Sequence, residues 1–188
     1  YYSDYFIIQM SIPTFSIMTP VNVHSQERGM QLQRAIDSVK HQSYSVAGSQ
    51  EGLWEHIIIN DGSPVEFTLP DYPWIKRLDQ AHLERMIALN LGFKEVTKDW
   101  IVFLDSDDML SPYYLEACAN MINKYPEFSV FNFGSTHFHP KYTISNRGTF
   151  NPPMLEKGHE VFSSGTIVNG TFIFKRECYE KLGGFPHV

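Results

Sequence analysis

The stretch WIVFLDSDDML, residues 100–110, constrains the fold of this chain more than any other part of the sequence. Its first five residues, Trp100 to Leu104, are apolar and predict a strand buried on both faces. Asp105, Asp107 and Asp108 follow directly, although carboxylates so close together repel one another and resist desolvation. A cation has to compensate these charges, and the identity of that cation is the central question.

The chain is long enough for one globular domain but has no broad basic surface. It contains 188 residues, of which 43% are hydrophobic, so it can bury a substantial core. We expect one domain over residues 15–188, preceded by an N-terminal extension over residues 1–14. The formal net charge of −6 argues against a nucleic acid partner. No apolar run approaches the roughly 18 to 20 residues of a membrane span.

Apolar runs alternate with segments of helical periodicity along the chain. Strands are predicted at residues 15–21, 54–59, 100–104, 128–134 and 171–175. Because these runs are mainly apolar rather than alternating, and because they alternate with helical segments, the pattern favours an α/β fold built on a mainly parallel sheet. Residues 65–80 contain Pro70 and Pro73 and are predicted to be an irregular connection.

Four segments are predicted to be helices. The apolar stripes of the first two are Leu32, Ala35, Ile36, Val39 and Leu83, Ile87, Leu91. The third helix is expected to begin with Ser111 as its cap and Pro112 in its first turn, and to end at Pro126. The fourth covers RECYEKL and is stopped by Gly183 and Gly184.

Polar residues follow the first three apolar strands, in the stretches TPVN, NDGS and DSDD. Ligands of open α/β sheets bind outside the carboxyl ends of the strands, so we expect these clusters to form one site. Aspartates two residues apart can offer oxygens to one hard divalent cation, Mg²⁺ or Mn²⁺, which commonly also binds substrate phosphates. Each cluster also has a structural interpretation, because aspartates after strands frequently cap turns.

The first two clusters also offer groups suited to a nucleotide base. Asp61 can accept a hydrogen bond from a ring N–H, and Thr19 and Pro20 can supply hydroxyl and backbone contacts along the edge of a base. Asp61 is equally acceptable as a turn former before Gly62, and Thr19 and Pro20 as ordinary loop residues.

Taken in order, these motifs resemble the family 2 glycosyltransferases, which have the GT-A fold, over residues 15–185. FSIMTPVN resembles the opening strand of the family, LQRAIDSVKHQSY its first helix, and HIIINDGS its second strand and turn. ERMIALNLGFKEVTKDWIVFLDSDDMLSP resembles its D-x-D region, and GTIVNGTFIFKRECYEKLGGF its later strand and helix. Five motifs in the family's order favour the metal interpretation of the aspartates.

The resemblance implies transfer of a sugar from a nucleoside diphosphate, most often a UDP-sugar, to an acceptor hydroxyl with inversion. Thr19, Pro20 and Asp61 would then hold the base, and Asp105 the ribose. Asp107 would hold a Mn²⁺ or Mg²⁺ ion on the diphosphate, with Asp105 as a further metal ligand, and Arg85 would contact the phosphate or the base. The remaining residues of the implied donor-binding set are Val21, Asn22, Asn90 and Ser106.

A general base is also implied, because an alcohol is a poor nucleophile at neutral pH. In the family this base is an acid shortly after the Gly-Gly-Phe motif. No carboxylate follows Phe185 here, so we expect the base beyond Val188 and expect the chain alone to be inactive. The family further implies a saccharide or lipid-linked acceptor in polysaccharide, cell wall or glycolipid synthesis. It also implies a cytoplasmic location with peripheral association at the inner membrane face.

Two other functions fit parts of the sequence. A phosphatase that uses the first Asp of a D-x-D motif as nucleophile would carry the motif on its first strand, whereas here it follows the third. A non-catalytic domain that binds a nucleotide sugar or a partner within a larger protein would need no base. His137 and His139 lack a third ligand nearby in the sequence and are expected in a loop or strand edge rather than a metal site.

Overall fold

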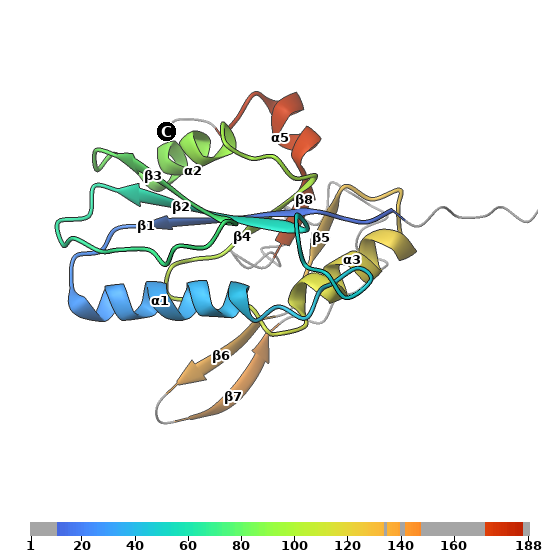
Figure 1. The fold of residues 1–188 in the computed structure, drawn as a ribbon, viewed down its shortest axis with the longest axis horizontal. Helices are drawn as coiled ribbons and strands as arrows, with labels where there is room; N and C mark the ends of the chain where they lie inside the picture. Colours follow the sequence, from blue (N-terminus) through green and yellow to red (C-terminus); the bar gives the residue numbers. More distant parts are fainter. Residues whose placement is uncertain (1–10, 134, 140–141, 148–171, 186–188) are drawn as a thin grey trace, which may run out of the picture.

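The computed structural model is a layered α/β fold around a six-stranded sheet (Figure 1). The structure describes residues 11–133, 135–139, 142–147 and 172–185. The sheet consists of β1 (Phe15–Val21), β2 (Trp54–Asp61), β3 (Ile75–Gln80), β4 (Trp100–Phe103), β5 (Val130–Asn132) and β8 (Phe172–Lys175). In space the strands follow the order β3-β2-β1-β4-β8-β5.

Most of the sheet is parallel, as the mainly apolar, non-alternating strands predicted. Strand β1 pairs in parallel with β2 on one side and β4 on the other, and β2 pairs in parallel with β3. Strand β8 runs antiparallel to both β4 and β5. Because β2 and β4 lie on opposite sides of β1, the loops that follow β1, β2 and β4 open a crevice at the carboxyl edge, where α/β folds bind ligands.

Helices cover both faces of the sheet (Figure 1). On one face lie α1 (Gln26–Lys40) and α3 (Tyr114–Lys124), and on the other α2 (Arg85–Phe93) and α5 (Arg176–Leu182). The buried face of α1 is the predicted stripe of Leu32, Ala35, Ile36 and Val39. Helix α5 ends as predicted, since Gly183 adopts the left-handed conformation at φ 73° that glycine favours at helix ends.

The connection over residues 65–80 is only partly irregular, which corrects the prediction. Its last six residues form β3, an edge strand that pairs with β2. The strand is only half buried and carries the charged residues Lys76, Arg77 and Asp79, so it lacks the apolar run that marks the central strands. Two prolines before it obscured the strand further.

Two helices differ in detail from the prediction. Helix α2 begins at Arg85, so Leu83 lies before it and is exposed; the buried residues of this helix are Ala88, Leu89, Gly92 and Phe93. Helix α3 has Tyr113 as its N-cap rather than Ser111. The carbonyl oxygen of Ser111 accepts a hydrogen bond from the Tyr114 N–H at 3.0 Å, so Ser111 forms a turn before the helix. Helical periodicity fixes the existence of an element better than its first turn.

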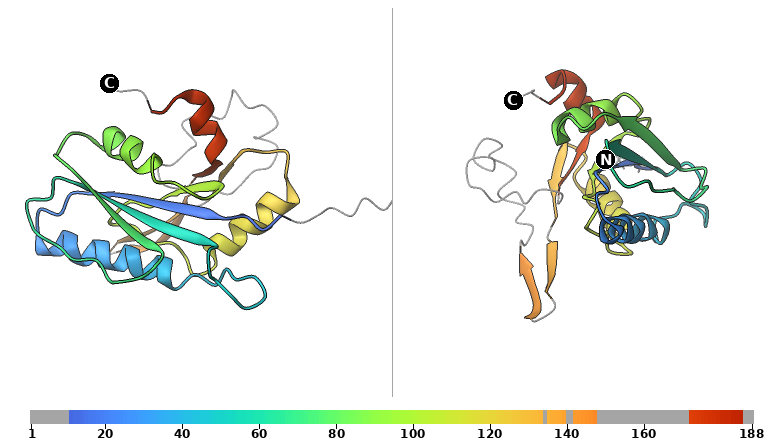
Figure 2. Two further views of the ribbon diagram at one scale, coloured as in Figure 1. Left: turned by 45° about the horizontal axis from the view of Figure 1, so that its top comes forward. Right: turned by 90° about the vertical axis from the view of Figure 1, so that its left-hand side faces the viewer.

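A separate hairpin of β6 (Ser135–His139) and β7 (Tyr142–Arg147) extends away from the layered body (Figure 2). His137 and His139 therefore lie on a strand. Among the described residues, no helix is long and apolar enough to cross a bilayer. Most of the proposed extension 1–14, the GTIVNGT part of the last motif, and the expected position of the general base lie outside the described residues.

Candidate donor-binding site

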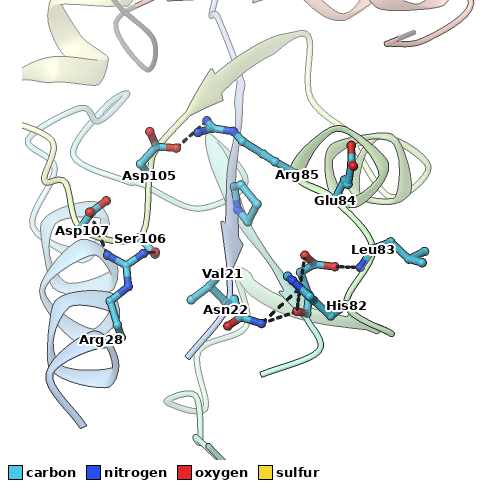
Figure 3. A pocket seen from close by; sticks show the side chains of 12 residues that line it. Val21, Asn22, Arg28, His82, Leu83, Glu84, Arg85, Asp105, Ser106 and Asp107 are labelled. Atoms are coloured by element: carbon cyan, nitrogen blue, oxygen red, sulfur yellow. Dashed lines mark hydrogen bonds and ion pairs between the residues drawn. The ribbon is translucent and has the colours of Figure 1, made fainter. Parts of the chain in front are cut away.

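A pocket of about 770 Å³ lies at the carboxyl edge of the sheet (Figure 3). This volume is in the usual range for small-molecule sites. The pocket is lined by Pro20, Val21, Asn22, Arg28, Asp61, His82, Leu83, Glu84, Arg85, Asp105, Ser106 and Asp107. The ends of β1, β2 and β4 and the first turns of α1 and α2 therefore meet here, and the three polar clusters of the sequence are brought together.

Asp61 is fixed at the end of β2 by its neighbours. Its Oδ1 accepts from Gln80 Nε2 at 2.7 Å and from the Leu83 N–H at 3.0 Å. Its Oδ2 lies 3.0 Å from His82 Nδ1. The side chain of Asp61 is only 9% exposed, whereas that of His82 is 69% exposed. Asp61 and His82 both line the pocket, so the exposed His82 ring covers part of a nearly buried carboxylate.

Asn22 connects the ends of the first two strands. Its Nδ2 donates to the carbonyl oxygens of Asp61 at 2.6 Å and Gly62 at 3.2 Å. Pro20 and Val21, which precede it in the chain, also line the pocket; Figure 3 shows Val21 beside Asn22. The end of β1 is thus tied to the turn that carries Asp61, and the two segments form one wall.

The D-x-D turn after β4 is compensated by two arginines. Asp105 Oδ1 pairs with Arg85 Nη2 at 2.5 Å, and Asp107 Oδ2 pairs with Arg28 Nη1 at 2.9 Å. Arg28 Nη2 also donates to Ser106 Oγ at 3.1 Å. Figure 3 shows these two arginines approaching the turn from opposite sides. Without a ligand, the charges of Asp105 and Asp107 are therefore neutralised by guanidinium groups.

Arg28 was absent from the sequence prediction. It lies in the first turn of α1, where the helix dipole disfavours a positive charge. A cation in that position needs an anion nearby, and this is the one signal in the sequence that could have drawn attention to it. Its partner lies 79 residues further along the chain, so no local pattern reveals the pair.

Thr19 is not among the pocket-lining residues. Its side chain is fully buried, and its Oγ1 lies 2.8 Å from His56 Nε2 on the neighbouring strand. Burial lowers the pKa of His56 from 6.5 to about 3, because the charged imidazolium is disfavoured away from water. Thr19 and His56 thus form a buried, neutral polar pair between β1 and β2.

Asn90 also lies outside the pocket lining. Its Oδ1 accepts from the Tyr179 hydroxyl at 2.8 Å and from the Phe185 N–H at 2.9 Å, and its Nδ2 donates to the Phe185 carbonyl at 3.1 Å. These bonds fasten the Gly-Gly-Phe segment after α5 onto α2. Within the structure, the Asn-x-Gly helix and the Gly-Gly-Phe motif are therefore linked directly.

The charges that line the pocket favour a bound cation. Asp61, Glu84, Asp105 and Asp107 outnumber the two arginines, so a phosphate-bearing ligand would meet a net negative surface. No cluster of three or more potential metal-binding side chains exists among the described residues. A divalent ion shared between one or two carboxylates and substrate phosphates still fits, because Mg²⁺ and similar ions need few protein ligands in such sites. Asp107, half exposed, is more accessible than Asp105 or Asp61.

Comparison with known families decides where the chain belongs. The model of the family described as "Glycosyl transferase family 2" matches residues 25–183, well over half of the chain. The chain belongs to glycosyl transferase family 2. The matched range includes α1, the Asp61 turn, the D-x-D segment and α5 up to Gly183, which confirms the resemblance inferred from the sequence.

Individual relatives agree with this assignment. An E. coli K12 protein described as the uncharacterized glycosyltransferase YibD is 33% identical over 73 residues, which cover 36% of this chain and 21% of that protein. The crystal structure of S. aureus TarS 1–349 in complex with UDP has a TM-score of 0.68 at 14% identity. The UDP-GlcNAc complex of the same protein gives 0.67 at 14% identity.

Both TarS comparisons cover 92% of this chain. They cover 50% and 48% of the TarS chain, so this chain spans about half of its length. At this level of identity the similarity confirms the fold, which is the GT-A arrangement expected from the sequence.

Proposed function

We propose that this family 2 glycosyltransferase uses a UDP-sugar as donor and transfers the sugar to an acceptor hydroxyl with inversion. The observation that carries the proposal is the pocket itself, which brings Asp61 and the D-x-D turn to one crevice at the carboxyl edge of the sheet. Asp61 suits the N–H of a uracil ring, and the D-x-D turn suits a metal-bound diphosphate. The TarS complexes with UDP and UDP-GlcNAc, on the same fold, support this choice of nucleotide.

Each wall of the pocket has a proposed task. Pro20, Val21 and Asn22 flank the base, while Asp61 accepts its ring N–H after His82 moves aside. On the opposite wall, Asp105 meets the ribose and Arg85 the phosphates. Thr19 acts through the structure, by supporting the end of β1, and Asn90 by holding the Gly-Gly-Phe segment.

The chemistry requires stabilisation of the departing nucleoside diphosphate. A Mn²⁺ or Mg²⁺ ion on Asp107, with Asp105 nearby, would supply Lewis-acid stabilisation of the leaving phosphate. Arg85 adds a charge-assisted donor on the same side. The general base is proposed to lie after Val188, and the acceptor to be a saccharide or lipid-linked molecule met at the inner face of a membrane.

Isothermal titration of the chain with UDP tests the proposal. We expect binding with Mn²⁺ present and at least about tenfold weaker binding in EDTA or in the Asp107→Asn variant, because an unscreened diphosphate meets the carboxylates. Asp71→Asn removes the same charge from an exposed position outside the pocket and should leave affinity unchanged. Binding of equal strength without metal, or no binding of UDP at all, would contradict the proposed donor site.

A further inference from the structure

We propose that Arg28 makes metal binding at the D-x-D turn dependent on the nucleotide. Without ligand, Arg28 neutralises Asp107; when the nucleoside diphosphate enters, the guanidinium transfers to a phosphate and releases the carboxylate to the metal. This inference rests on the proposed donor function and assigns a specific task to a residue outside the predicted site.

The position of Arg28 supports such an exchange. Its Nη1 contacts both Asp107 Oδ2, at 2.9 Å, and Gln31 Oε1, at 3.0 Å, and its Nη2 contacts Ser106 Oγ at 3.1 Å. The side chain is 27% exposed, and it lines the pocket from the first turn of α1. The guanidinium is therefore held at the pocket surface and directed at the D-x-D turn (Figure 3).

The bonds of Arg28 are also incomplete. Its Nε is buried and has no hydrogen-bond partner in the structure. Arginine offers five N–H donors in a planar fork that matches phosphate oxygens well. Contacts with Asp107, Ser106 and Gln31 use three of these five N–H groups, so the guanidinium has donors left for a phosphate once it leaves Asp107.

Electrostatics makes the exchange cooperative. A divalent ion that approaches Asp107 in the free protein meets the positive guanidinium on the same carboxylate, and the two cations repel strongly at such distances. A diphosphate between them changes this repulsion into two attractive contacts. The metal should therefore bind weakly alone and much more tightly with nucleotide, and by linkage the nucleotide should gain the same factor from the metal.

The coupling is measured by titrating the 188-residue chain with Mn²⁺ alone, UDP alone, and each in the presence of the other. For the wild type we expect each ligand to raise the affinity of the other by about tenfold or more. In Arg28→Gln we expect the factor to fall to about threefold or less, because Mn²⁺ alone binds more tightly and UDP with Mn²⁺ binds more weakly. Arg34→Gln, which removes the same charge from an exposed position of α1 outside the pocket, should behave as wild type.

The outcomes separate this inference from the proposed function. If wild type binds no UDP with or without metal, the donor site fails and the inference fails with it. If wild type shows metal-dependent UDP binding and Arg28→Gln has the same coupling factor, only the inference is overturned. Arg28→Lys keeps the charge but loses the planar fork, so it should retain part of the coupling; it decides the matter if circular dichroism shows that Arg28→Gln does not fold.

Discussion

Replacing Gly62 by alanine should damage the turn that carries Asp61. Gly62 has φ 62°, and a Cβ built there would lie 2.4 Å from the His82 backbone nitrogen and 2.8 Å from His82 Cβ. The left-handed conformation costs an alanine about 1 kcal/mol. A contact with backbone cannot be relieved by rotating a side chain, and overpacking of this kind costs a further ~1–3 kcal/mol.

We therefore expect Gly62→Ala to lower the free energy of unfolding by about 2–4 kcal/mol in urea titrations followed by tryptophan fluorescence. Gly52→Ala is the matched control, because Gly52 has φ 72° but no atom lies within 4 Å of its built Cβ. It should lose only about 1 kcal/mol. Since the turn holds Asp61 and faces His82, Gly62→Ala should also weaken UDP binding. Equal destabilisation by the two substitutions would refute the argument that this close approach supports the site.

Two further predictions concern polar groups outside the pocket lining. The pKa of His56 is lowered from 6.5 to about 3 in the folded chain. Below pH 6.5 His56 is therefore protonated in the unfolded chain but not in the folded one, and the free energy of unfolding decreases as the pH falls. From pH 6 to pH 5 this contributes a loss of about 1 kcal/mol in urea unfolding, which His56→Gln should remove; an unchanged pH dependence in the variant would contradict it. Asn90→Ala breaks three hydrogen bonds to Tyr179 and Phe185 and should cost ~1–3 kcal/mol, with faster amide hydrogen exchange in α5. Exchange in α5 at the wild-type rate would show that these bonds do not fasten the helix.

Helix α1 and the central strands were predictable because the pattern of apolar residues in each matches the faces that the element buries. Helix α1 has one apolar face and packs it against a sheet, so its periodicity alone identified Leu32, Ala35, Ile36 and Val39. Strands β1, β2 and β4 are buried on both faces, and their sequences are mainly apolar without a regular alternation of apolar and polar residues. The position of the pocket followed from these strands, since parallel strands share one carboxyl edge.

Features that depend on distant partners could not be predicted in the same way. Strand β3 lies at an edge, where charged residues are tolerated and the apolar signal is lost. The Thr19 side chain contacts His56 on the neighbouring strand instead of lining the pocket. Its position near the end of a strand does not reveal this contact in the sequence. Arg28 is an ordinary helix residue until its contact with Asp107 is known.

Among the described residues, those that line the pocket all fall between positions 20 and 107, although the sheet itself is completed by β5 and β8 later in the chain. The described lining of the pocket thus comes from one continuous stretch of sequence, to which the later described segments contribute no residue. Insertions, deletions or exchanges after α3 leave the identity of its lining unchanged. In evolutionary terms, residues 20–107 can be conserved as a unit that keeps the pocket lining, while the later residues diverge.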